Sequence, residues 1–282
     1  MKFTLPKQIA ALAALLLTPL VLLPVRAVEN PQPGAGGALP PGFSQIEIMV
    51  GGTNREALIY APAAAATTSS PVVFVFHGHG GSSRQVARSI PMSRDWPEAI
   101  SVYMQGLNTP GLLLDHEGKK PGWQHAAGVE NDRDLKFVDA MLEKLKHDYK
   151  VDPQRIYATG HSNGGGFTYL LWETRPEIFA AFAPIAAATA KAASLKPKPA
   201  LHVAGEKDPI VKFEWQTLTM DAVKKDNGCD AEGKPWADHC TIYPSKTGTP
   251  LVTFIHPGGH EIPPGAPAAI IKFFKEYPMA QK

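Results

Sequence analysis

The stretch Gly160-His161-Ser162-Asn163-Gly164 most constrains what this chain can fold into. An apolar run, Ile156 to Ala158, precedes it, and a helix-compatible run from Phe167 to Thr174 follows. Glycines at both ends of the pentapeptide relieve the clashes that side chains would cause in a tight turn between a strand and a helix. The pattern predicts a serine with strained backbone angles, an exposed hydroxyl, and the free N–H groups of a new helix beside it. A glycine-rich turn with an incidental serine is the alternative.

The first 27 residues have the features of an export signal. Lys2 and Lys7 make the start positive, Ile9 to Leu23 is mostly apolar, and Val25-Arg26-Ala27 supplies small residues for cleavage. We therefore expect cleavage after Ala27 and a protein that is secreted or periplasmic. Prolines interrupt the apolar run, which is short for a bilayer, so a retained anchor is the less favoured alternative and we expect no stable membrane association.

The remaining 255 of 282 residues suit one large domain. Residues 28–43 are rich in Pro and Gly and are expected to form a leader, and residues 44–282 are expected to form a single catalytic domain. The net charge of +2 argues against a nucleic-acid partner. We expect a monomer.

Strand and helix patterns alternate along this domain. Apolar strand patterns occupy 71–76, 100–104, 156–158, 179–185, 199–204 and 251–256, and helical patterns occupy 132–149, 213–225 and 266–277. Residues 45–60 predict an antiparallel hairpin at a sheet edge, and 105–130 a long loop. The alternation predicts an α/β fold, a mainly parallel sheet flanked by helices, whose ligands sit at the carboxyl ends of the strands.

A serine needs a base and an orienting acid to become a nucleophile, and in this fold class the order is Ser, acid, His. The histidines after Ser162 are His202, His239, His256 and His260. We choose His260, just past the last strand, because His202 and His256 lie within apolar strands and are expected to be structural. Asp208 follows a strand and a Gly turn and is the expected acid, with Glu206 as the alternative.

The stretch His77-Gly-His79-Gly-Gly81 follows an early strand and predicts half of an oxyanion hole. The expected donors are the backbone N–H groups of His79 and Asn163. An H-x-H metal site at His77 and His79 is the alternative, but no third ligand is evident nearby, so we expect no metal.

Cys229 and Cys240 form an even pair in a chain expected to be exported. An oxidising compartment favours a disulfide between them, which would close a short polar loop.

Several blocks resemble the secreted polyhydroxybutyrate-depolymerase and feruloyl-esterase group of α/β-hydrolases. They are His77 to Gly81, Tyr103 to Gly106, Phe137 to Ala140, Val151 to Gly165 and Gly258 to His260. The resemblance covers nearly all of the expected mature chain. It implies Ser162, Asp208 and His260 as nucleophile, acid and base, and an enzyme without a metal or organic cofactor. The group usually has Trp two residues after its catalytic His, where this chain has Ile262, which would border the acyl pocket.

Trp123 and Gln124, in Pro121-Gly-Trp-Gln124, are the expected substrate contacts, with Trp123 stacking on an aromatic acyl group or a sugar. A loop aromatic packed over the core is the alternative for Trp123, and Trp215 is expected to pack its helix. Together these features predict a secreted serine carboxylesterase that cleaves feruloyl or acetyl esters of plant polysaccharide through an acyl-enzyme. The alternatives are a polyhydroxyalkanoate depolymerase or other short-chain esterase, and a non-catalytic polysaccharide-binding protein.

Overall fold

The computed structural model describes residues 39 and 42–279 of the chain. The expected export signal, 1–27, and nearly all of the expected leader, 28–43, lie outside the described residues. Among the described residues, no helix is long and apolar enough to cross a membrane.

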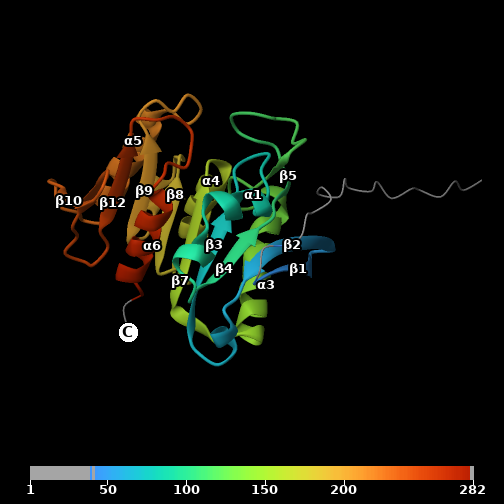
Figure 1. Cartoon of the computed structure of the whole chain (residues 1–282). Helices are drawn as coiled ribbons and strands as arrows, with labels where there is room; N and C mark the ends of the chain where they lie inside the picture. Colours follow the sequence, from blue (N-terminus) through green and yellow to red (C-terminus); the bar gives the residue numbers. More distant parts are fainter. Residues whose placement is uncertain (1–38, 40–41, 280–282) are drawn as a thin grey trace, which may run out of the picture. The chain divides into compact units, whose positions relative to one another are not determined.

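A ten-stranded sheet, ordered β1-β2-β4-β3-β7-β8-β9-β12-β11-β10, runs through the described domain (Figure 1). Its strands are β1 Phe43–Val50, β2 Thr53–Tyr60, β3 Ser70–Phe76, β4 Ile100–Met104, β7 Val151–His161, β8 Ala181–Ile185, β9 Ala200–Gly205, β10 Lys234–Ala237, β11 Cys240–Tyr243 and β12 Leu251–His256. The six central strands from β4 to β12 are parallel to one another. Antiparallel pairs close both edges.

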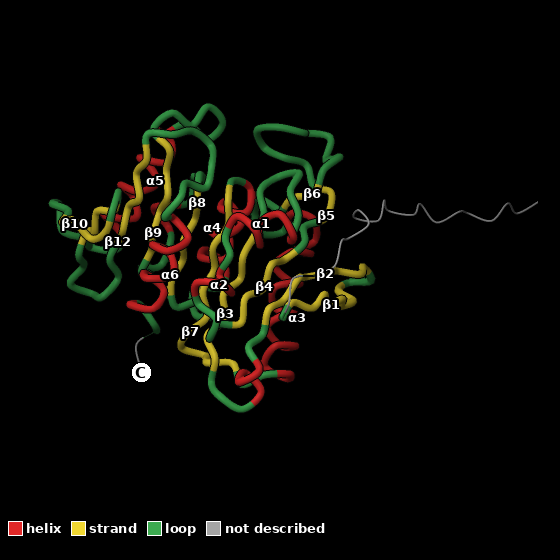
Figure 2. The backbone as a smooth tube through the Cα atoms, in the orientation of Figure 1, coloured by secondary structure: helices red, strands yellow, loops and turns green. Residues whose placement is uncertain are grey.

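Helices cover both faces of the sheet (Figures 1 and 2). They are α1 Ser83–Ser89, α2 Met92–Asp95, α3 Arg133–Asp148, α4 Asn163–Thr174, α5 Phe213–Asp226 and α6 Ala266–Glu276. Short 3-10 turns occupy Ala63–Ala66, Val129–Asp132 and Ala192–Ser194. The mainly parallel α/β architecture expected from the sequence is therefore confirmed.

Strand β3 explains why both faces must be covered. Successive side chains of a strand point to opposite faces. Phe74 and Phe76 accordingly pack into the core beneath α3, α4 and α5, whereas Val73 and Val75 pack into the core beneath α1, α2 and α6. All seven residues of the strand are buried, so a continuous apolar sequence satisfies both layers.

The sequence located most elements but missed those without an apolar pattern. The hairpin at one edge is β1–β2, as predicted. At the other edge, β10 and β11 form a second antiparallel hairpin that the polar composition of this region did not indicate. The expected loop 105–130 contains the two-stranded ladder of β5 Leu107–Asn108 and β6 Pro121–Gly122.

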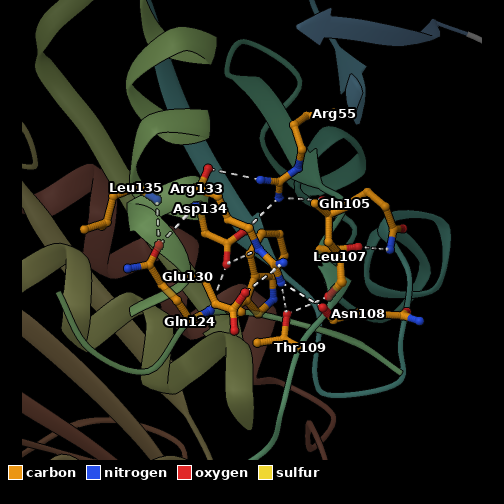
Figure 3. A network of polar contacts seen from close by, with 12 residues as sticks. Arg55, Gln105, Leu107, Asn108, Thr109, Gln124, Glu130, Arg133, Asp134 and Leu135 are labelled. Carbon is orange, nitrogen blue, oxygen red and sulfur yellow. Dashed lines mark hydrogen bonds and ion pairs between the residues drawn. The ribbon is translucent and has the colours of Figure 1, made fainter. Parts of the chain in front are cut away.

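A buried polar network fixes both ends of the segment that contains this ladder (Figure 3). The guanidinium of Arg55 on β2 pairs with Asp134 on α3 at 2.8 Å, and both side chains are almost fully buried. Arg55 also donates to the carbonyl of Gln105, and the other Asp134 oxygen accepts from the N–H of Gln124 at 2.8 Å. Breaking such a pair by removing one partner typically costs about 3–5 kcal/mol, because the remaining charge is left buried.

Candidate active site

Ser162 stands on a sharp turn between β7 and α4, as its flanking glycines predict. Its backbone has φ 56° and ψ −121°, a strained combination for a residue with a side chain. A Cβ at Gly160 would lie 2.5 Å from the carbonyl of Gly164, and one at Gly164 would collide with the backbone of Phe76. The hydrogen bond from the N–H of Ser162 to the carbonyl of Ile185 holds the turn at 2.9 Å.

The structure brings Ser162, His260 and Asp208 into one chain of hydrogen bonds. His260 Nε2 lies 2.7 Å from Ser162 Oγ, and His260 Nδ1 lies 2.7 Å from Asp208 Oδ2. Because the carboxylate only accepts, Nδ1 carries a proton, and Nε2 is left to accept from the serine hydroxyl. Residues far apart in sequence thus meet at the carboxyl ends of the parallel strands.

Asp208 is buried and held from several sides. Its Oδ1 accepts from the N–H groups of Ile210 and Val211, each at 2.9 Å. Its Oδ2 accepts from the side-chain amide of Gln216 on α5 at 3.2 Å, besides His260. These donors satisfy a carboxylate that burial would otherwise destabilise.

The residues weighed as alternatives lie outside this chain of contacts. Glu206 is exposed, and its backbone N–H donates to the carbonyl of His256. His256 is buried and accepts from the N–H of Gly258 through Nδ1. His202, expected to be structural, lies between Tyr169 and Gln216 in the core, where burial lowers its pKa to about 4.

His79 and Asn163 lie side by side next to Ser162. A Cβ at Gly122 would meet both the His79 ring, 2.6 Å away, and Asn163 Oδ1, 2.9 Å away. A Cβ at Gly78 would approach the Cβ of Ser162 to 3.4 Å. Asn163 opens α4, so its backbone N–H is among those without an acceptor within the helix.

His161 is a contact of the site that sequence reasoning did not single out. Its ring centroid lies 4.9 Å from that of His260. Burial lowers the pKa of His161 to about 4, so its ring stays neutral beside His260 at neutral pH. Its position between Gly160 and Ser162 was visible in the sequence, but its partner 99 residues away was not.

The expectation that Trp123 and Gln124 contact substrate is wrong. Trp123 is fully buried, stacks on Phe167 with ring centroids 5.3 Å apart, and donates through Nε1 to the carbonyl of His77 at 2.8 Å. Gln124 is also fully buried, and its side chain bonds to Asp132 and to the backbone at the start of α3. Both residues lie under the site, so Trp123 follows the alternative of a loop aromatic packed on the core.

Trp215 was expected to pack its helix, but its side chain is exposed. Its side chain is 40% exposed and, with Leu218, lines a groove of about 450 Å³ between α5 and residues 188–193. The next residue on α5, Gln216, is buried and contacts Asp208, so the two side chains leave the helix in different directions. Ile262 is half-buried and packs against the core on the α6 side.

The expected disulfide between Cys229 and Cys240 is absent, and both residues are free thiols. Cys229 lies directly opposite Ser245. Cys240 is the first residue of β11 and precedes Ser245 by five residues of extended chain. At about 3.3 Å per residue this separates the cysteines by roughly 16 Å. A disulfide requires Cα atoms within about 7 Å, so the strand β11 prevents the bond.

Both ring nitrogens of His77 are engaged by the protein. Nδ1 donates to the carbonyl of Gly78 at 2.8 Å, and Nε2 accepts from the N–H of Gly106 at 2.9 Å. Burial lowers the pKa of His77 to about 4. His79 instead bonds to Asp115. Within 42–279 and residue 39, no three His, Cys, Asp or Glu side chains are grouped to hold a metal ion.

Known proteins resemble this chain in sequence and in fold. The Prolyl oligopeptidase family matches residues 123–194, which include Ser162. A putative esterase, NocK, of Nocardia uniformis subsp. tsuyamanensis is 27% identical over 180 residues, covering 60% of this chain and 49% of its own. The chain thus spans about half the length of that relative. A probable feruloyl esterase C of Aspergillus flavus is 26% identical over 216 residues, covering 72% of this chain and 77% of its own.

The solved structure of an acetyl xylan esterase from Aspergillus awamori shares the fold. Its TM-score is 0.64 at 14% identity, and the match covers 82% of this chain and 99% of that one. The strained serine turn, the mainly parallel sheet and the esterase relatives agree with one another. The chain therefore has the α/β-hydrolase fold, and the sequence relatives that it matches are named as esterases.

Proposed function

We propose that the protein is an exported serine esterase that cleaves feruloyl or acetyl esters of plant polysaccharide. The observation that carries the proposal is the continuous contact from Ser162 Oγ through His260 to Asp208, at 2.7 Å for each link. The strained turn places this serine at the start of α4, where N–H groups and the helix dipole favour developing negative charge.

In the proposed reaction, Ser162 Oγ attacks the ester carbonyl while His260 Nε2 takes the hydroxyl proton. Asp208 stabilises the resulting imidazolium through Nδ1 and does not itself take the proton. The carbonyl oxygen becomes an oxyanion that accepts from the backbone N–H groups of His79 and Asn163. Collapse of this intermediate breaks the ester C–O bond, and His260 returns the proton to the departing alcohol. Water, deprotonated by His260, then releases the acid from Ser162.

The proposed substrate class rests on the named relatives and on the groove that Trp215 lines. The feruloyl esterase C relative covers most of this chain. Trp215 on α5 offers an accessible aromatic face, suited to an aromatic acyl group or a sugar ring. Ile262 follows His260 by two residues and is half-buried, and we propose that its exposed part forms a small apolar boundary of the acyl pocket. The reaction requires no cofactor, and we propose that the chain acts as a monomer after removal of residues 1–27.

A substrate panel with a matched variant tests the proposal. Wild type should hydrolyse methyl ferulate or acetylated xylan, and an aryl phosphonate should label Ser162. Ser162→Ala should lose at least about a thousandfold in kcat with its melting temperature nearly unchanged. Preferential cleavage of hydroxybutyrate oligomers would move the substrate to polyesters. Folded wild type that neither hydrolyses esters nor takes the label would refute the enzyme and favour a polysaccharide-binding protein.

A further inference from the structure

We propose that the segment of residues 109–124, which contains the loop 109–120, acts as a clamp on the oxyanion hole, and that Asp115 is its positioning residue. The proposal rests on the function proposed above, since it concerns how His79 presents its backbone N–H. Figure 2 shows this loop rising from the β5–β6 ladder. It packs against the turn after β3, because a Cβ at Gly111 would lie 3.4 Å from the His79 ring.

His79 needs an external restraint because glycines flank it. Gly78 precedes it, and Gly80, with φ +75°, and Gly81 follow. Such a stretch has little conformational preference of its own, so the direction of its N–H groups depends on other contacts. The N–H of Gly80 donates to the carbonyl of Pro121 at 2.7 Å. This bond connects the glycine-rich turn after β3 to the clamp at Pro121.

Asp115 supplies the contact to His79 itself. Its Oδ2 lies 2.9 Å from His79 Nε2 and accepts from the N–H of Lys120 at 2.9 Å, while Oδ1 accepts from that of Lys119 at 3.1 Å. Its backbone carbonyl accepts from the N–H groups of Gly111 and Gly118. The hydrogen bond to His79 and those to the backbone lower the pKa of Asp115, so it is a carboxylate. One residue thus closes the loop and holds His79.

The same segment holds the second expected donor. The side-chain amide of Asn163 pairs with the backbone of Trp123: its Oδ1 accepts at 2.7 Å and its Nδ2 donates at 3.1 Å. Gly122 lies where the His79 and Asn163 side chains meet, with no room for a Cβ. The side chains of His79 and Asn163, whose N–H groups would stabilise the oxyanion, are therefore both held by residues of the clamp.

The two ends of that stretch are themselves fixed (Figure 3). Arg133 donates to the carbonyl of Asn108 and to Thr109 Oγ1, at 2.8 and 2.6 Å, and Gln124 is bound to the start of α3. A clamp with anchored ends holds donors in place before the substrate arrives. Such preorganised donors act on the transition state more than on the ground state, so loosening them should lower kcat and leave KM unchanged.

The experiment compares Asp115→Ala and Asp115→Asn with Glu117→Gln, a change at an exposed carboxylate of the same loop. Removing one oxyanion donor costs about 10²–10³ in kcat, and a misplaced donor should cost less, roughly ten- to hundredfold for the Ala variant. The Asn variant keeps an acceptor for His79 and should recover part of this loss. Inactivation by an aryl phosphonate should slow in parallel, and Glu117→Gln should match wild type.

A double variant separates positioning from general destabilisation. His79→Ala keeps the backbone N–H but loses the contact with Asp115, so it should lower kcat to a similar extent. The variant Asp115→Ala/His79→Ala should then be no worse than either single change. Folded Asp115 variants with kcat within twofold of wild type would overturn the clamp, as would additive losses in the double variant. Neither result would affect the proposed esterase, which wild-type hydrolysis and labelling of Ser162 test separately.

Discussion

Trp123 should contribute to stability and not to substrate binding. It is fully buried, meets Phe76 edge-on at 5.2 Å and stacks on Phe167 at 5.3 Å. Trp123→Phe removes the hydrogen bond to the carbonyl of His77, which costs about 1–2 kcal/mol, and leaves a small cavity that costs roughly 1 kcal/mol more. Trp123→Ala should cost about 3–5 kcal/mol for the lost ring alone, a large part of the 5–15 kcal/mol typical of a domain.

Urea unfolding followed by far-UV circular dichroism measures these losses without relying on tryptophan fluorescence. Trp215→Ala is the matched control, because its side chain is 40% exposed and should cost less than about 1 kcal/mol. The same control should raise KM for methyl ferulate more than for nitrophenyl acetate. A Trp123→Phe variant that keeps its midpoint in urea while KM for methyl ferulate rises would refute the packing role.

The free thiols and the buried histidines give further predictions. Alkylation in denaturant should modify both Cys229 and Cys240 without prior reduction, and a reductant should leave the melting temperature within about 1 °C, as no disulfide constrains the unfolded chain. His77, His161 and His202 have pKa values lowered to about 4 by burial, so the unfolded chain binds protons more readily between pH 6.5 and 4. Their contribution to stability is present above pH 6.5 and lost as the pH falls, by up to about 1.4 kcal/mol per pH unit each. The midpoint of urea unfolding should therefore fall from pH 7 to pH 5, and an unchanged midpoint would contradict the buried neutral rings.

The parallel core was predictable from the sequence because its chemistry is local. The run Pro71 to Phe76 is apolar throughout, and a strand covered on both faces requires that pattern. Gly160 and Gly164 predicted the turn at Ser162, because any side chain at either position would clash with the backbone. The choice of Asp208 and His260 followed from chain order and from the ends of strands, and in the structure His260 contacts both Ser162 and Asp208.

What the sequence could not predict depends on contacts between distant segments. The sequence around Trp123 does not indicate whether its side chain faces solvent or Phe167. The packing of residues 105–124 against α4 determines that it faces Phe167. The cysteines are close in sequence, but β11 holds them apart, and the polar residues around it gave no strand signal. The bond between Asp115 and His79 joins two loops, and neither loop carries a pattern that identifies the other.

The buried residue His202 helps to orient Asp208 through a chain of hydrogen bonds, although it does not contact Asp208 itself. The carboxylate can only accept, so Gln216 must turn its NH₂ toward Asp208 and its oxygen toward His202. His202 must then donate through Nε2, which leaves Nδ1 to accept from the hydroxyl of Tyr169 at 2.7 Å. This sequence of donors requires a neutral ring in a single tautomer, and the burial that lowers the pKa of His202 to about 4 supplies that state. The acid of the proposed triad is thus oriented by a chain of donors that extends through α5 and β9 into the core, and each member has one arrangement that satisfies its neighbours.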